Sequence, residues 1–158
     1  MFNGIETPEQ HLSKVTCDIM REDRYTHLAG ILMIGSREVS DDVPTACTNG
    51  RDEKYGREFI KNMSSAELKF LVLHENYHKM YKHLTTWKHL CAKDPQLANM
   101  AMDYNINGKI CDENKDTTSV SVPLVGGWIP PRYSIYFMRR KNKVTVVVTA
   151  TATVTVIP

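Results

Sequence analysis

The stretch Met63–His83, MSSAELKFLVLHENYHKMYKH, decides the fold of this chain. Ser64 can cap a helix and Glu67 can return the hydrogen bond to it, which together form the capping box that begins many helices. An apolar run, Leu71–Leu73, follows at positions that helical periodicity assigns to a buried face. The sequence therefore predicts a helix that extends from Ser64 to about Leu84.

This predicted helix contains the HExxH sequence His74-Glu75-Asn76-Tyr77-His78. Because a helix turns about 100° per residue, His74 and His78 lie one turn apart on the same face. Two imidazoles at that spacing can occupy two corners of a zinc tetrahedron, and zinc acidifies a bound water. Glu75 can take the proton of that water and pass it to a leaving amine. The capped, apolar context favours this zinc site over a pair of surface histidines.

A hydrolytic zinc usually has three protein ligands and one open position, so a third ligand is needed. The candidates are Asp103 and His83. Asp103 lies on the next predicted helix, which can fold back over the motif, and its apolar neighbours favour a buried, paired carboxylate. His83 is rotated about 140° from His78 on an unbroken helix, so a role as hydrogen-bonding partner of a ligand suits it better. We predict Asp103 as the third ligand and keep His83 as the rival.

Other residues near the motif are weaker candidates. His89 is a poor third choice of ligand, and His11 and His27 are expected to be structural or at the surface. Tyr77 and Tyr104 each carry a hydroxyl that can stabilise an oxyanion. Packing in the core or at the rim of the site is the expected role of both tyrosines.

Two other segments carry signals for the start of a helix. Thr7–Gln10 combines a capping threonine, a proline in the first turn and a capping-box glutamine, and predicts a helix to about Arg21. Asp94-Pro95 places a cap before a proline at the first helical position. This second helix is expected to stop near Gly108.

The strand signals are less specific. Leu28–Ile34 is a short apolar run that fits either a buried strand or the end of a helix. Asn49-Gly50, within the polar segment 41–56, predicts a hairpin or a bent edge strand. Residues 112–134 have the composition of a loop. The uncharged Val/Thr run after Lys143 has high β-propensity and the profile of an aggregation-prone edge, and it fits a strand, a disordered tail or an aberrant extension.

The composition is that of one globular domain of 158 residues, with 42% hydrophobic and 24% charged residues. Twenty basic and 18 acidic residues leave a formal charge of +2, which argues against nucleic acid or a membrane surface as the main partner. The four cysteines form no CxxC pair, so reduced thiols are expected. No signal peptide or membrane-spanning run is evident, and a cytoplasmic location is expected.

Four stretches of the chain resemble a known family: TACTNGRDEKYGREFI (45–60), MSSAELKFLVLHENYHKMYKH (63–83), DPQLANMAMDYNIN (94–107) and VPLVGGWIPPRYS (122–134). They resemble the zincin-like metallopeptidase domain found N-terminal to von Willebrand factor A-like domains in bacterial and phage proteins. The resemblance covers roughly residues 7–134. It implies an α+β zincin-like fold with zinc on His74 and His78, Glu75 as base, and an edge strand within Thr45–Ile60, while the family pattern retains both His83 and Asp103.

The sequence therefore predicts a zincin-like metallopeptidase domain over residues 1–134 and an atypical basic, then Val/Thr-rich tail over 135–158. The expected cofactor is Zn²⁺ and the expected substrate is a peptide or protein, in the cytoplasm of a bacterium or a phage-infected host. Two alternatives remain open. One is a zinc amidase acting on a non-protein substrate, and the other is a non-enzymatic, zinc-stabilised module of phage or prophage assembly.

Overall fold

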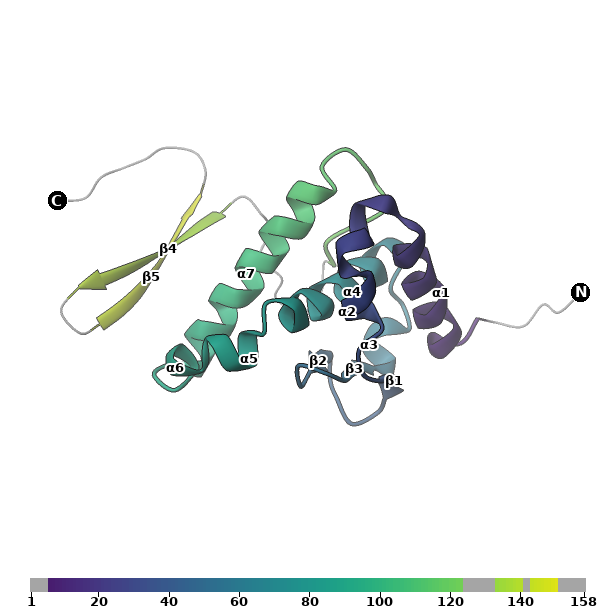
Figure 1. The fold of residues 1–158 in the computed structure, drawn as a ribbon, viewed down its shortest axis with the longest axis horizontal. Helices are drawn as coiled ribbons and strands as arrows, with labels where there is room; N and C mark the ends of the chain where they lie inside the picture. The colour runs from purple at the N-terminus through teal and green to yellow at the C-terminus, as the bar shows by residue number, and fades with distance from the viewer. Residues whose placement is uncertain (1–5, 124–132, 141–142, 151–158) are drawn as a thin grey trace, which may run out of the picture.

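The computed structural model describes residues 6–123, 133–140 and 143–150, and these residues form an α+β fold (Figure 1). The helical elements are α1 (Pro8–Arg21), the 3-10 helix η1 (Asp23–Leu28), α2 (Ala29–Leu32), α3 (Arg57–Ile60), α4 (Ser65–Met80), α5 (His83–Thr86), α6 (Lys88–Cys91) and α7 (Pro95–Glu113). The strands are β1 (Arg37–Ser40), β2 (Ala46–Thr48), β3 (Glu53–Gly56), β4 (Tyr133–Arg140) and β5 (Lys143–Ala150).

The three long helices begin where the sequence predicts. Complete capping boxes are present at α1, between Thr7 and Gln10, and at α4, between Ser64 and Glu67. At α7 the side chain of Asp94 accepts a hydrogen bond from the backbone of Leu97, and a proline follows the cap. These caps satisfy backbone N–H groups that have no partner inside the helix.

Two helix ends differ from the prediction. The active-site helix was expected to continue to about Leu84, but α4 ends at Met80, and Lys82 adopts a left-handed conformation (φ 50°, ψ 43°) before α5 begins at His83. A non-glycine residue in that conformation costs about 1–2 kcal/mol, and the His83 side chain that follows it is buried. Conversely, α7 continues through Gly108 to Glu113. A glycine inside a helix costs only about 1 kcal/mol relative to alanine, and burial continues beyond it, with Ile110 fully buried.

The apolar segment Leu28–Ile34, left open between strand and helix, is mostly helical: it contains the end of η1 and all of α2. Leu28 and Leu32 are both buried. Gly35 then turns the chain into β1 with φ 76°, and a Cβ at this position would lie only 2.1 Å from the backbone oxygen of Arg51. The turn therefore requires glycine both for its backbone conformation and for the close approach.

A three-stranded sheet with the order β1-β3-β2 lies beside α4. β1 and β3 are parallel, whereas β2 and β3 are antiparallel and joined by the predicted Asn49-Gly50 turn. In that turn the side-chain oxygen of Asn49 accepts hydrogen bonds from the backbone N–H groups of Arg51 and Asp52. β2 is an edge strand of this sheet, in agreement with the strand expected within residues 45–60.

α4 is the central element of the core. It packs against α1, α7, α2 and β2, and every residue from Leu68 to Tyr77 is buried. A helix that is buried on all sides must accommodate its polar side chains internally, so each needs a partner or a function. The polar residues buried on α4 are Lys69, His74, Glu75, Asn76 and Lys79.

The Val/Thr run is partly a strand. Backbone pairing of β4 with β5 is antiparallel, with Tyr133 opposite Ala150 and Arg140 opposite Lys143. Residues 124–132 of the segment expected to be a loop, and residues 151–158 of the tail, lie outside the described residues. All four cysteines are free thiols, as predicted. Among the described helices, none has the length and hydropathy needed to span a membrane.

Candidate metal centre

α4 and α7 bring together the three residues predicted as zinc ligands. The Nε2 atoms of His74 and His78 are 3.0 Å apart, and the Oδ1 atom of Asp103 lies 3.0 Å from the His78 nitrogen and 3.5 Å from the His74 nitrogen. Zinc bonds of about 2.0–2.1 Å at tetrahedral angles place neighbouring donor atoms about 3.3 Å apart. The spacing and the chemistry of the three donors therefore fit three corners of a zinc tetrahedron.

Each of these three side chains is held from outside by a second residue. The Nδ1 atom of His74 lies 2.8 Å from Oδ1 of Asn107, so its N–H is donated there and Nε2 is left bare toward the other donors. Asn99 donates a hydrogen bond of 2.8 Å to Oδ2 of Asp103. Such partners fix the tautomer and orientation of metal ligands.

His83 contacts His78, the third side chain of the cluster. The break at Lys82 cancels the rotation that an unbroken helix would impose, and it brings Nδ1 of His83 to 3.0 Å from Nδ1 of His78. The prediction assumed an unbroken helix that turns His83 away from the motif, and this was wrong because the helix ends at Met80. His83 nevertheless contacts the outer nitrogen of His78 and is not part of the three-residue cluster. Burial, together with the neighbouring His78, lowers the pKa of His83 to about 4, so its ring is neutral at pH 7.

Glu75 lies beside the cluster and is 5% exposed. Burial raises the pKa of its carboxyl to about 7, and no described residue forms a hydrogen bond or an ion pair with it. Asp103 is different: burial acts to raise its pKa, but its contacts with the imidazoles of His74 and His78 lower it to about 2. The site thus combines one permanently charged carboxylate with one that can exchange a proton near neutral pH.

These residues share a cavity of about 510 Å³. The lining includes the segment Thr45–Thr48, which contains the edge strand β2, and residues of α7 together with Leu84. Among the described residues that line the cavity, only Glu75 and Asp103 are acidic, and none is lysine or arginine.

Comparison with models of protein families matches residues 10–122 to the family described as "Putative metallopeptidase domain". The chain belongs to this family. No curated protein and no solved structure matches the chain. The matched segment runs from α1 past the end of α7, so the whole candidate metal centre of this metallopeptidase domain lies within it.

Of the weaker candidates from the sequence, Tyr104 lies at the cavity, whereas Tyr77, His27 and His11 do not. The Tyr77 hydroxyl donates to the carboxylate of Glu113 and lies 3.1 Å from Nε2 of His27, and neither Tyr77 nor His27 lines the cavity. Tyr104 does line it, whereas His11 contacts Ser65 at the protein surface. Tyr77 therefore packs in the core, as expected.

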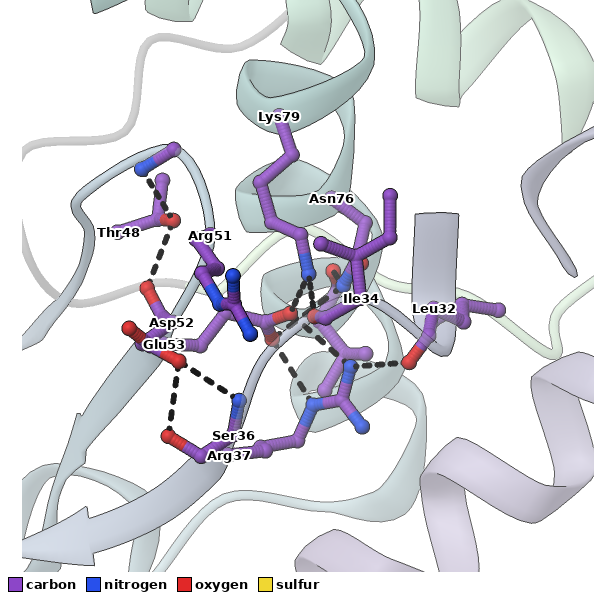
Figure 2. Close-up of polar contacts among 12 residues, drawn as sticks. Leu32, Ile34, Ser36, Arg37, Thr48, Arg51, Asp52, Glu53, Asn76 and Lys79 are labelled. Atoms are coloured by element: carbon purple, nitrogen blue, oxygen red, sulfur yellow. Dashed lines mark hydrogen bonds and ion pairs between the residues drawn. The ribbon is translucent and has the colours of Figure 1, made fainter. Parts of the chain in front are cut away.

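A group of buried charges behind α4, shown in Figure 2, was not predicted from the sequence. Glu53 of β3 is 1% exposed and forms ion pairs with Arg37 of β1 and Lys79 of α4. Lys79 directly follows His78 in sequence, and a lysine inside a helix that is otherwise buried was the available signal. Its partners lie far away in the chain, however, so the sequence pattern could not show where its charge is neutralised.

Proposed function

We propose that this chain is a zinc-dependent metallopeptidase that hydrolyses peptide bonds. His74, His78 and Asp103 hold the zinc, and Glu75 is the general base. The observation that carries the proposal is the convergence of two imidazole nitrogens and one carboxylate oxygen at tetrahedral spacing. Beside them lies a buried glutamate with no hydrogen-bond or ion-pair partner among the described residues.

The residues of the chain divide the reaction between them. Bound zinc polarises the scissile carbonyl and acidifies water. Glu75 takes a proton from the attacking water and delivers it to the leaving amine, a double role that suits a carboxyl whose pKa is raised to about 7. Asn107 and His83 keep the two imidazoles oriented through their Nδ1 atoms.

The shape and charge of the cavity favour an extended peptide as substrate. The edge strand β2 lines the cavity, and the backbone of such a strand can pair with an added strand. The described residues of the lining include no lysine or arginine that could pair with a terminal carboxylate. We therefore infer cleavage of internal peptide bonds in a peptide or protein, and not a nucleic-acid or membrane partner.

The two alternatives find less support in this geometry. A small-molecule amidase would need a closed pocket, whereas this cavity is bordered by the edge strand β2. A purely structural zinc usually has four protein ligands. Among the described residues, the cluster contains three, and the nearest further histidine, His83, contacts the outer nitrogen of His78.

The test is zinc content and peptide hydrolysis in the same preparations. We expect one zinc per chain in the wild type and in the control His89→Ala, which changes an exposed histidine. Zinc should be lost in His74→Ala and in Asp103→Ala. Hydrolysis of an internally quenched peptide should stop with a chelator and return with zinc. A zinc-loaded wild type that cleaves no peptide in a random library would refute the peptidase proposal.

A further inference from the structure

The buried charges behind α4 form one group around a single carboxylate, here called the Glu53 cluster (Figure 2). The carboxylate of Glu53 accepts hydrogen bonds from Arg37 through Nε at 2.9 Å and Nη2 at 3.0 Å, and from Lys79 through Nζ at 2.6 Å. The Tyr55 hydroxyl and the Asn76 amide donate to it as well. Two cations therefore share one carboxylate that solvent does not reach.

The position of Lys79 on α4 makes this arrangement unexpected. Lys79 follows Glu75 by four residues, and a glutamate four residues before a lysine is the favourable order for an ion pair along a helix. Lys79 instead directs its ammonium to Glu53 and, at 2.9 Å, to the backbone oxygen of Ile34. The Glu75 carboxylate has no ion-pair partner among the described residues.

The charge balance explains why Glu53 is needed to keep the Lys79 ammonium away from Glu75. Arg37 and Lys79 carry two positive charges and Glu53 carries one negative charge, so the cluster already has an excess of positive charge. The side chain of Lys79 is 2% exposed and cannot turn to solvent without leaving the core. If Glu53 lost its charge, the nearest carboxylate along the helix for the Lys79 ammonium would be that of Glu75, one turn away.

We propose that Glu53 is a positioning residue: it holds the Lys79 ammonium against the sheet and thereby prevents it from pairing with Glu75. The Glu75 carboxylate is then left to face the metal centre. This inference rests on the proposed role of Glu75 as general base. It adds that the sheet residue Glu53 controls which partner Glu75 has.

A double-mutant cycle tests the proposal, using Glu53→Gln, Lys79→Met and the combination of both. We expect Glu53→Gln to lower kcat at least about tenfold, because the freed ammonium pairs with the base. Lys79→Met should stay within about threefold of wild type, since Lys79 takes no part in the reaction. In the Lys79→Met background, Glu53→Gln should cost little. Rates are compared per zinc-loaded chain, well below the lowest melting temperature of the set.

A purely structural role for Glu53 predicts a different result. Its loss would then lower kcat equally with and without Lys79, and that outcome would overturn the inference. A large loss of kcat in Lys79→Met alone would also overturn it, because Lys79 would then serve the reaction directly. The second result can be obtained even if Glu53→Gln does not fold.

A crystal structure of Glu53→Gln separates this inference from the proposed function. The Lys79 ammonium within hydrogen-bond distance of the Glu75 carboxylate would support the inference, even in a protein that proved to bind no zinc. An ammonium that remains on the Ile34 carbonyl would overturn it, whatever the activity. If the wild type itself neither binds zinc nor cleaves peptides, the proposed function fails independently of where Lys79 lies.

Discussion

At the scale of single residues, the carboxylates of Glu75 and Asp103 lie in one cavity with opposite surroundings. Asp103 contacts the nitrogens of two imidazoles, and Glu75 is buried without a partner among the described residues. Two carboxyl groups whose surroundings shift their pKa values in opposite directions suit two roles, one as a permanently charged ligand and one as a proton carrier. The division of labour thus follows from local contacts on α4 and α7.

The first prediction concerns Glu75. Glu75→Gln keeps the shape of the side chain but cannot take a proton, so we expect zinc content to stay at the wild-type level while kcat falls by about 10²–10⁴-fold. Metal analysis and peptide hydrolysis on the same sample measure both quantities. Loss of zinc in this variant would show that Glu75 is a ligand and would contradict its assignment as base.

The second prediction concerns the residues that hold the imidazoles. We expect His83→Ala and Asn107→Ala each to weaken zinc affinity by about 10–100-fold while still binding one zinc at saturation. Competition with a chromophoric chelator measures the affinity, and His89→Ala is the matched control. If His83→Ala loses zinc altogether, as Asp103→Ala is expected to, then His83 is itself a ligand.

Most of this site could be predicted from the sequence, because its geometry is local. His74, Glu75 and His78 are fixed relative to one another by one turn of helix, and the start signal at Asp94 made a returning helix with Asp103 plausible. The contact of His83 could not be predicted, because it depends on a left-handed residue at a lysine, which no sequence signal marked.

At the scale of elements, the starts of all three long helices were predictable, whereas only one of their ends was, that of α1 at Arg21. The starts depend on side chains within four residues, whereas the ends of α4 and α7 depend on which ring or aliphatic chain is buried against distant residues. The hairpin of β2 and β3 was expected from Asn49-Gly50. The parallel pairing of β1 with β3, and the charges of the Glu53 cluster, join segments far apart in the chain and left no local signal.

The break between α4 and α5 gives the third prediction. Lys82→Gly relieves the left-handed strain of about 1–2 kcal/mol but increases the entropy of the unfolded chain, so we expect stability to rise by up to about 1 kcal/mol. Lys14→Gly, on the exposed face of α1, is the matched control and should lower stability by about 1 kcal/mol. Urea unfolding measures both. Equal destabilisation by the two changes would show that Lys82 is not left-handed in solution.

The Glu53 cluster gives the fourth prediction, through pH. Burial acts to raise the pKa of Glu53, but Arg37, Lys79 and Tyr55 outweigh it and lower the pKa below the ordinary 4.5. A lowered folded-state pKa contributes stability that is complete above the unfolded pKa and is lost as pH falls through the folded value. The unfolding free energy of Glu53→Gln should therefore fall less steeply than that of the wild type below about pH 4.5. Identical slopes would mean that Glu53 is not ionised in the folded protein.

At the scale of the whole molecule, the candidate site and the C-terminal hairpin are separate in sequence. The described residues that line the cavity lie between Thr45 and Asn107, and the family match ends at residue 122. The strands β4 and β5 follow this segment and pair with each other along their full length. The hairpin therefore supplies none of the residues to which the site assigns a role.

The last prediction follows from that pairing. A chain that ends after Pro123 should bind zinc and hydrolyse peptides like the full chain, with a melting temperature only slightly lower. It should also be more soluble, because the uncharged Val/Thr run is removed. Deleting only residues 143–158 should give a less soluble protein than deleting the whole hairpin. It would leave β4 without its partner among the described strands, and an unpaired strand edge promotes association. Light scattering and thermal unfolding of the two truncations distinguish these outcomes. If the longer truncation loses zinc or unfolds at a much lower temperature, residues beyond Pro123 are part of the folded domain.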